Sequence, residues 1–128
     1  MTNYDLEEVN LLNWQLLLTS FFILSTFVSL SLTYNEVLKR KKKVPLYSDQ
    51  EQQNILKFNR LLASSIALGF LFINIKDKNV RLLYNDCDER AANMQITASV
   101  FTLIATTIVL YIAFTNKQDS ANNLNPEL

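Results

Sequence analysis

The chain has 128 residues, 49% of them hydrophobic, and its 12 basic and 12 acidic residues give a formal net charge of zero. This balance gives nucleic acid no net attraction, so we expect no nucleic-acid partner. The chain has one cysteine and no histidine, which excludes an intrachain disulfide, a cysteine zinc cage and histidine-based catalysis.

The charged residues fall into blocks separated by long uncharged stretches. A soluble amphipathic helix instead carries a charged residue at almost every turn. The distribution therefore predicts an all-α, multi-pass integral membrane protein, a single membrane domain over residues 1–128 whose spans lie in a lipid bilayer. No targeting motif distinguishes a bacterial cell membrane from a virus-associated or organellar one.

The first predicted span comprises residues 11–34. Its 24 uncharged residues would form a helix about 36 Å long, enough to cross a hydrocarbon core of about 30 Å with some tilt. Acidic residues precede this stretch, and five basic residues follow it: Lys39, Arg40, Lys41, Lys42 and Lys43. A cleaved secretory signal has its basic region first. We therefore expect a retained membrane anchor.

The second predicted span comprises residues 55–75. Its uncharged part, residues 61–75, would be only about 22 Å long as a helix. Extending it back to Ile55 includes Lys57 and Arg60, whose long stems can carry their charges toward the headgroups. Ser48 and Glu51 have the spacing of a capping box, so this helix is expected to begin in the loop at 35–54. A shallow or re-entrant segment is the alternative.

The third predicted span comprises residues 96–114, 19 residues without a charge, or about 28 Å of helix. In the preceding loop, residues 76–95, apolar side chains recur at spacings of three and four: Val80, Leu83, Tyr84, Cys87, Ala91 and Met94. This pattern indicates a short amphipathic helix, which either lies on the membrane surface or prolongs the third span. Residues 116–128 are expected to be an unstructured tail.

Orientation follows from the lysines and arginines of the short loops, which are in excess on the cytoplasmic side. Seven lie between residues 35 and 60, four between 76 and 95, and one in the tail. The bias predicts the N-terminus outside and the C-terminus in the cytoplasm. The basic run, with Lys57 and Arg60, is interpreted as a topology determinant that can also contact anionic lipid headgroups.

Small and hydroxyl side chains form stripes on all three predicted spans. They recur every three, four or seven residues and comprise Thr19, Ser25, Thr26, Ser29, Thr33, Ala63, Ser65, Ala67, Gly69, Ala98, Thr102, Ala105 and Thr106. Such stripes let transmembrane helices approach and hydrogen-bond one another. The alternative is a polar pathway lined by hydroxyls when several copies assemble. Amides near the span ends are expected to reach interfacial water: Asn13, Gln15, Asn59 and Asn74.

The sequence contains no nucleotide-binding loop, nucleophile elbow or paired catalytic carboxylate, so we expect neither a cofactor nor independent catalysis. Asp86, Asp88 and Glu89 lack the ligand spacing and glycine of an EF-hand loop, so no metal site is predicted. Cys87 is expected to be an inert thiol, with an intermolecular disulfide as the alternative. The central part of each span carries no charge, which argues against a proton relay or voltage sensor.

Three short spans enclose little interior, so association with other copies or with a larger membrane protein is expected. The favoured hypothesis is a non-catalytic subunit or interaction partner of a membrane assembly, disrupted by enlarging Gly69 or Ala105. The alternative is a homo-oligomeric pore. In size, span number and topology the chain resembles phage holins of the three-span type, which implies such a pore. Its long first loop and its weakly charged tail depart from that pattern, and no motif is shared. A third hypothesis is an enzyme subunit that lends its external loop to a partner.

Overall fold

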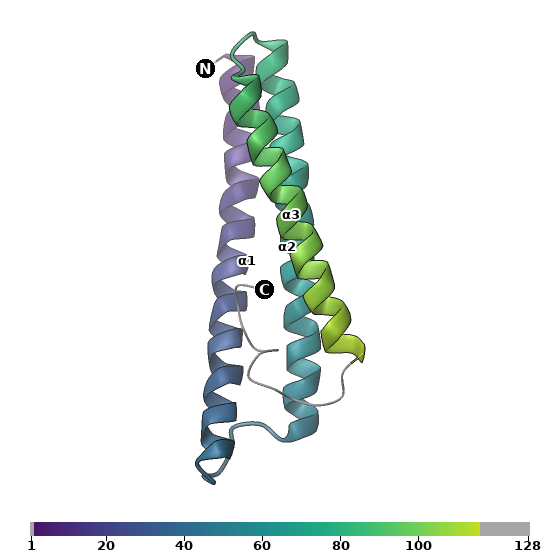
Figure 1. Cartoon of the computed structure of the whole chain (residues 1–128). Helices are drawn as coiled ribbons and strands as arrows, with labels where there is room; N and C mark the ends of the chain where they lie inside the picture. The colour runs from purple at the N-terminus through teal and green to yellow at the C-terminus, as the bar shows by residue number, and fades with distance from the viewer. Residues whose placement is uncertain (1, 116–128) are drawn as a thin grey trace.

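The computed structural model describes residues 2–115, which form three α-helices: α1 (Asn3–Arg40), α2 (Asp49–Leu83) and α3 (Glu89–Thr115) (Figure 1). The described residues contain no strand, which confirms the all-α prediction. Each helix is long and apolar enough to cross a membrane. The expected tail at 116–128 lies outside the described residues.

The helices extend beyond the uncharged runs because their ends are capped by polar groups. The predicted capping box at the start of α2 is confirmed: Ser48 Oγ accepts from the Glu51 amide at 3.2 Å, and the Ser48 amide donates to Glu51 Oε1 at 3.3 Å. At the start of α1, Thr2 Oγ1 accepts from the Asp5 amide at 3.1 Å. These bonds satisfy first-turn amides that have no partner within a helix.

Helices α1 and α2 end in the same way, at a residue in the left-handed conformation. Lys42 has φ 57° and Asn85 has φ 56°. The amide after each bonds back to the helix: Lys43 N reaches the Leu38 carbonyl, and Asp86 N reaches the Arg81 carbonyl, both at 2.9 Å. This is the Schellman pattern, which satisfies the last carbonyls and reverses the chain.

The ending at Asn85 changes the expectation for residues 76–95. In place of a separate short helix, residues 76–83 prolong α2, residues 89–95 prolong α3, and a loop at 84–88 joins them. The apolar residues of this segment do not share one packed face, since Val80 is buried while Leu83 and Met94 are exposed. The apolar residues spaced three and four apart therefore belong to two helices that run in different directions.

Helix α2 is the centre of the molecule, because it packs on both α1 and α3, whereas α1 and α3 make few contacts with each other. Figure 1 shows α3 crossing α2 obliquely and moving away from α1 toward its C-terminal end. The N-terminus and the α2–α3 loop lie together at one end of the molecule, here named the α2–α3 end. The opposite end, with the α1–α2 loop, is named the α1–α2 end.

The interior is small for a chain of this length. One apolar cluster contains Leu32, Leu56 and Ala113, with partly buried neighbours that include Val28 and Ile55. Many large apolar side chains point outward instead, among them Leu16, Phe27, Phe72, Phe101 and Tyr111, each at least 63% exposed. A soluble bundle would hide such a surface, whereas a membrane protein exposes it to lipid.

The only glycine of the chain, Gly69, lies opposite Leu18 of α1. A Cβ atom at position 69 would lie 2.8 Å from Leu18 Cδ1 and 3.2 Å from Leu18 Cδ2. Both atoms belong to the end of a flexible side chain. One added carbon can therefore be accommodated by a rotamer change, whereas a branched side chain cannot.

We predict that Gly69→Leu lowers the free energy of unfolding in detergent micelles by about 1–3 kcal/mol, because overpacking separates α1 from α2. Gly69→Ala should stay within about 1 kcal/mol of the parent, since a better helix former offsets the tighter contact. Adding Leu18→Ala to Gly69→Leu should recover most of the loss. Equal stability of the single and double variants would contradict this packing.

Candidate functional site

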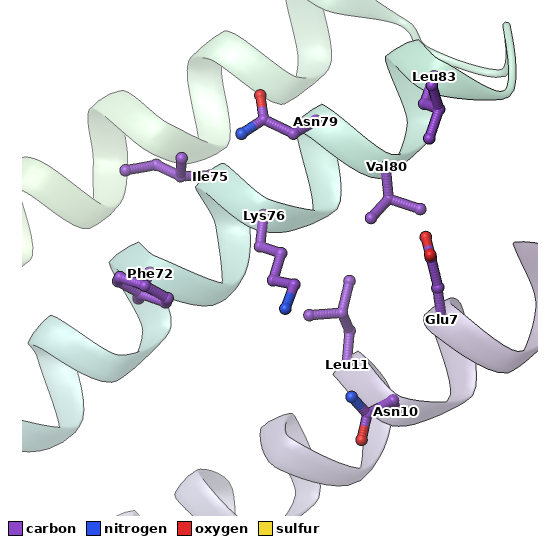
Figure 2. A pocket seen from close by; sticks show the side chains of 9 residues that line it. All are labelled: Glu7, Asn10, Leu11, Phe72, Ile75, Lys76, Asn79, Val80 and Leu83. Atoms are coloured by element: carbon purple, nitrogen blue, oxygen red, sulfur yellow. The ribbon is translucent and has the colours of Figure 1, made fainter.

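Helices α1 and α2 face each other along two different kinds of contact. Toward the α2–α3 end they border an open groove, whose outer part has a volume of about 580 Å³ and is lined by residues that include Leu11, Lys76 and Val80 (Figure 2). Toward the α1–α2 end they are joined by buried polar side chains. We name these the polar column: Ser25, Ser29, Asn35 and Glu36 of α1, and Gln52 and Asn59 of α2, each no more than 8% exposed.

The inner part of the polar column is centred on the amide of Asn59. Its Oδ1 accepts from Ser25 Oγ at 2.7 Å, and its Nδ2 donates to Ser29 Oγ at 2.8 Å. Because Ser25 and Ser29 are one helical turn apart, they lie on the same face of α1. One amide thus bonds two hydroxyls of the neighbouring helix, which is a strong way to pair helices where water is absent.

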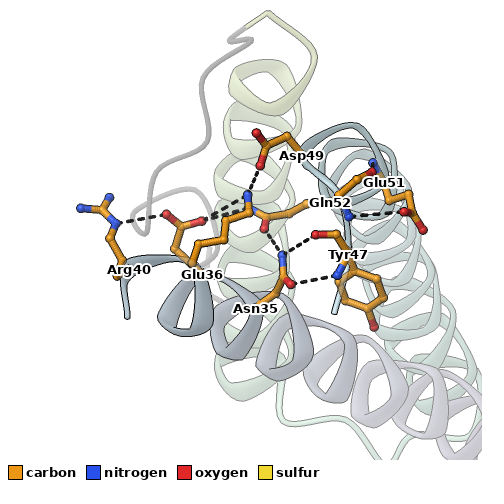
Figure 3. Close-up of polar contacts among 9 residues, drawn as sticks. Asn35, Glu36, Arg40, Tyr47, Asp49, Glu51 and Gln52 are labelled. Carbon is orange, nitrogen blue, oxygen red and sulfur yellow. Dashed lines mark hydrogen bonds and ion pairs between the residues drawn. The ribbon is translucent and has the colours of Figure 1, made fainter. Parts of the chain in front are cut away.

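The outer part of the polar column joins α1 to the start of α2 (Figure 3). Asn35 Nδ2 donates to Gln52 Oε1 at 2.5 Å, and Gln52 Nε2 donates to Glu36 Oε2 at 3.3 Å. Asn35 Oδ1 accepts from the Tyr47 amide at 2.9 Å. The Tyr47 hydroxyl lies 2.6 Å from Ser31 Oγ. These bonds fix the α1–α2 loop against both helices.

Part of the predicted basic cluster is bound into this network. Glu36 pairs with Arg40 at 3.3 Å and with Lys39 at 3.9 Å, and Lys39 also pairs with Asp49. The remaining members of the run, Lys41, Lys42 and Lys43, are exposed. They are the basic side chains of this loop that are open to an anionic surface.

The two basic residues at the start of the second span, Lys57 and Arg60, both lie against the protein. Lys57 Nζ lies 5.7 Å from the centre of the Phe114 ring, which joins α2 to α3 by a cation–π contact. Arg60 is only 2% exposed. Its side chain is therefore enclosed by the protein.

The α2–α3 end is held by a second group of polar contacts. The Tyr4 hydroxyl donates to Asp86 Oδ2 at 2.8 Å, and the rings of Tyr4 and Tyr84 are 5.0 Å apart. The hydrogen bond raises the pKa of Tyr4 to about 12. This contact ties the start of α1 to the α2–α3 loop.

Glu8, which precedes the predicted first span, lies near Asp77 and Arg81 of α2. Arg81 pairs with Glu8 at 3.6 Å and with Asp77 at 3.1 Å. Partial burial is the main cause that raises the pKa of the Glu8 carboxyl. A hydrogen bond with Asp77 and the negative charge of Asp77 raise this pKa further, whereas the positive charge of Arg81 lowers it. One guanidinium therefore holds two carboxyls that would otherwise repel each other across the helix pair.

The structure does not bring the predicted small and hydroxyl residues together as one surface. Ser29 and Ala67 are buried, Gly69 contacts Leu18, and Ala63, Ala105 and Thr106 are half-buried. The others are exposed: Thr19, Thr26, Thr33, Ser65, Ala98 and Thr102. Several of the hydroxyls bond a carbonyl of their own helix at 2.9–3.0 Å: Thr26, Thr33, Ser65, Thr102 and Thr106.

Sequence reasoning missed two amides that form hydrogen bonds between helices. Asn59 and Asn74 were expected to reach interfacial water, but Asn59 bonds Ser25 and Ser29, and Asn74 Nδ2 donates to Ser99 Oγ of α3 at 2.5 Å. A signal was present, since Gln52 and Asn59 are seven residues apart and so share a face of α2. It was missed because Gln52 lies outside the predicted span 55–75.

Within residues 2–115, no three acidic or cysteine side chains are grouped so as to hold a metal ion. Cys87, in the α2–α3 loop, is a half-buried free thiol. Comparison with protein-family models, with characterised proteins and with solved structures found no significant match to the chain. Function must therefore be inferred from the contacts and surfaces described above.

We predict that Asn59→Ala lowers the free energy of unfolding by about 1–2 kcal/mol, because it removes two hydrogen bonds that average about 0.6 kcal/mol each in a membrane protein. Asn13→Ala, at an exposed amide of α1, should change it by less than about 0.5 kcal/mol. In a double-mutant cycle with Ser25→Ala and Ser29→Ala, the effects should be less than additive. Strict additivity would show that these side chains do not interact.

Proposed function

We propose that the protein is a three-span integral membrane protein, with its N-terminus outside and its C-terminus in the cytoplasm. Within the membrane it acts as a non-catalytic subunit or interaction partner of a larger assembly. The observation that supports this proposal is the exposure of α3. Among the described residues of this long apolar helix, only Ala113 is buried.

The exposed surface of α3 includes small residues as well as large apolar ones. Ala98 and Thr102 are exposed one turn apart, next to the exposed ring of Phe101. Small side chains gain nothing from lipid, but they let a second helix approach closely. We therefore propose that this face of α3 receives a helix from a second copy or from a larger membrane protein.

The partners of the buried serines support a non-catalytic role. Ser25 and Ser29 are bonded to the side-chain amide of Asn59, and an amide cannot serve as the general base that a serine nucleophile requires. The pore alternative has no comparable support. The exposed hydroxyls of Thr26, Thr33 and Thr102 bond carbonyls of their own helices, which satisfies a hydroxyl that faces lipid.

The proposed orientation can be tested with the native thiol of Cys87, the only cysteine of the chain. A membrane-impermeant maleimide should label Cys87 in intact cells or right-side-out vesicles, because the α2–α3 loop faces outward. A chain with Cys87→Ser and Val44→Cys places the thiol in the α1–α2 loop, where Val44 is 88% exposed. It should be labelled only after permeabilisation. The opposite labelling pattern would reverse the orientation.

The proposed assembly can be tested by enlarging the small residues of α3. We predict that Ala98→Leu with Thr102→Leu reduces the oligomer or co-purified partner in mild detergent about fivefold, which corresponds to about 1 kcal/mol of helix association. The matched control is Thr107→Leu, because Thr107 is also exposed and lies about 180° around the helix from Ala98. It should leave assembly unchanged.

Unchanged assembly of the Ala98→Leu, Thr102→Leu chain would rule out this face as the contact surface. Purified protein should also be placed in liposomes at high density. Release of a trapped dye or ions would favour the homo-oligomeric pore over the accessory subunit.

A further inference from the structure

The groove between α1 and α2 continues from the α2–α3 end into the apolar part of the molecule. Its outer part, of about 580 Å³, and its deeper part, of about 560 Å³, share Asn10, Leu11, Phe72 and Lys76. The two parts therefore form one continuous cavity that is open at the side. We name it the α1–α2 groove.

Most polar side chains of the α1–α2 groove lie toward its outer part. The deeper part is lined mainly by apolar side chains, including Trp14, Leu18 and Leu68. The outer part carries the polar side chains Glu7, Asn10, Lys76 and Asn79. In Figure 2 the Lys76 side chain extends from α2 across the groove toward Leu11 and Asn10, while Glu7 lies farther out, near Val80.

The charges of the groove are placed at the level of lipid headgroups if the spans lie as proposed. Asn10 directly precedes the predicted span 11–34, and Lys76 directly follows the span 55–75. From Lys76 down to Ser65, which lines the deepest part, α2 rises about 16 Å, close to the half-thickness of about 15 Å of a hydrocarbon core. The groove thus has the length of one leaflet.

The two charged side chains of the groove, Glu7 and Lys76, are both exposed. Within residues 2–115, no ion pair involves Lys76 or Glu7. A ligand complementary to this lining places a negative group at Lys76, a positive group farther out at Glu7, and a hydrocarbon chain in the deeper part.

We propose that the α1–α2 groove binds one glycerophospholipid whose headgroup contains both a phosphate and a primary ammonium, as in phosphatidylethanolamine. One acyl chain lies along Leu18 and Leu68, the phosphate accepts from Lys76 Nζ, and the ammonium donates to the Glu7 carboxylate. This inference rests on the membrane insertion proposed above, but it does not depend on the assembly surface of α3.

The charges of Lys76 and Glu7 disfavour the other common phospholipid headgroups. A lipid with a phosphate and no cationic group would bring negative charge near Glu7 without compensation, which disfavours it. A quaternary choline carries a positive charge but has no N–H group to donate to a carboxylate. The primary ammonium satisfies both requirements.

The test measures lipid binding to the full-length protein in mild detergent, by native mass spectrometry and by the lipid-dependent rise in Tm. Phosphatidylethanolamine should bind about tenfold or more tightly than phosphatidylcholine or phosphatidylglycerol, the difference expected from one charge-assisted hydrogen bond. Lys76→Gln should weaken binding by a similar factor. Glu7→Gln should remove the preference, so that phosphatidylglycerol binds as well as phosphatidylethanolamine.

Two further variants separate the groove from general lipid contact. Ser65→Phe should fill the deep part and reduce binding, because Ser65 lines the groove and bonds only a carbonyl of its own helix. Ser20→Phe is the matched control, since Ser20 is exposed, bonds its own helix in the same way and lies outside the groove. Lys41→Gln is the control for charge.

Equal binding of the three lipids to the parent protein would overturn the proposal, as would undiminished binding by Lys76→Gln. A change of oligomeric state in Ser65→Phe without any loss of lipid would also overturn it, because it would show that a second copy occupies the groove. The Ala98→Leu, Thr102→Leu chain should bind lipid normally. Failure of the assembly surface and failure of the lipid site are therefore distinguishable.

Discussion

The amide of Asn59 is the interaction on which the arrangement of α1 and α2 depends. It bonds Ser25 and Ser29 at once, and a shift of one helix along or around the other would leave buried polar groups without partners. In an apolar layer water cannot replace those bonds. The apolar contact of Leu32 with Leu56 stabilises the α1–α2 pair but does not depend on one precise orientation. The hydrogen bonds of the Asn59 amide do, so they select one register of the two helices.

Helix α3 packs along α2, yet among its described residues only Ala113 is buried. It is joined to α2 by the Asn74–Ser99 bond and by the contact of Lys57 with Phe114. It makes few contacts with α1. A helix that packs against a neighbour on one side keeps the rest of its surface open to lipid or to another helix. On the proposal above, a partner helix would bind at this exposed surface without displacing a contact of α3 with α2.

The sequence could predict three helices because the length of an uncharged run is a direct measure of what can cross a bilayer. The capping box at Ser48 was also predictable, since both partners lie within one turn. What Asn59 and Asn74 contact was not predictable, because their partners lie 25 or more residues away in the chain and depend on helix register. The break at Asn85 was missed because its left-handed backbone interrupts a spacing that otherwise continues.

The polar column and the α1–α2 groove are two consequences of the same helix pair. Toward the α1–α2 end, short amide and hydroxyl side chains bond across the interface and close it. Toward the α2–α3 end the same two helices border an open space, with Leu18, Ser65 and Gly69 around its deeper part and Phe72 and Lys76 along both parts. At the α2–α3 end, the Glu8–Arg81 ion pair joins α1 to α2, and the bond from Tyr4 to Asp86 joins α1 to the α2–α3 loop. An opening closed at both ends by polar contacts can hold a ligand without loosening the fold, which is the physical reason to look for one there.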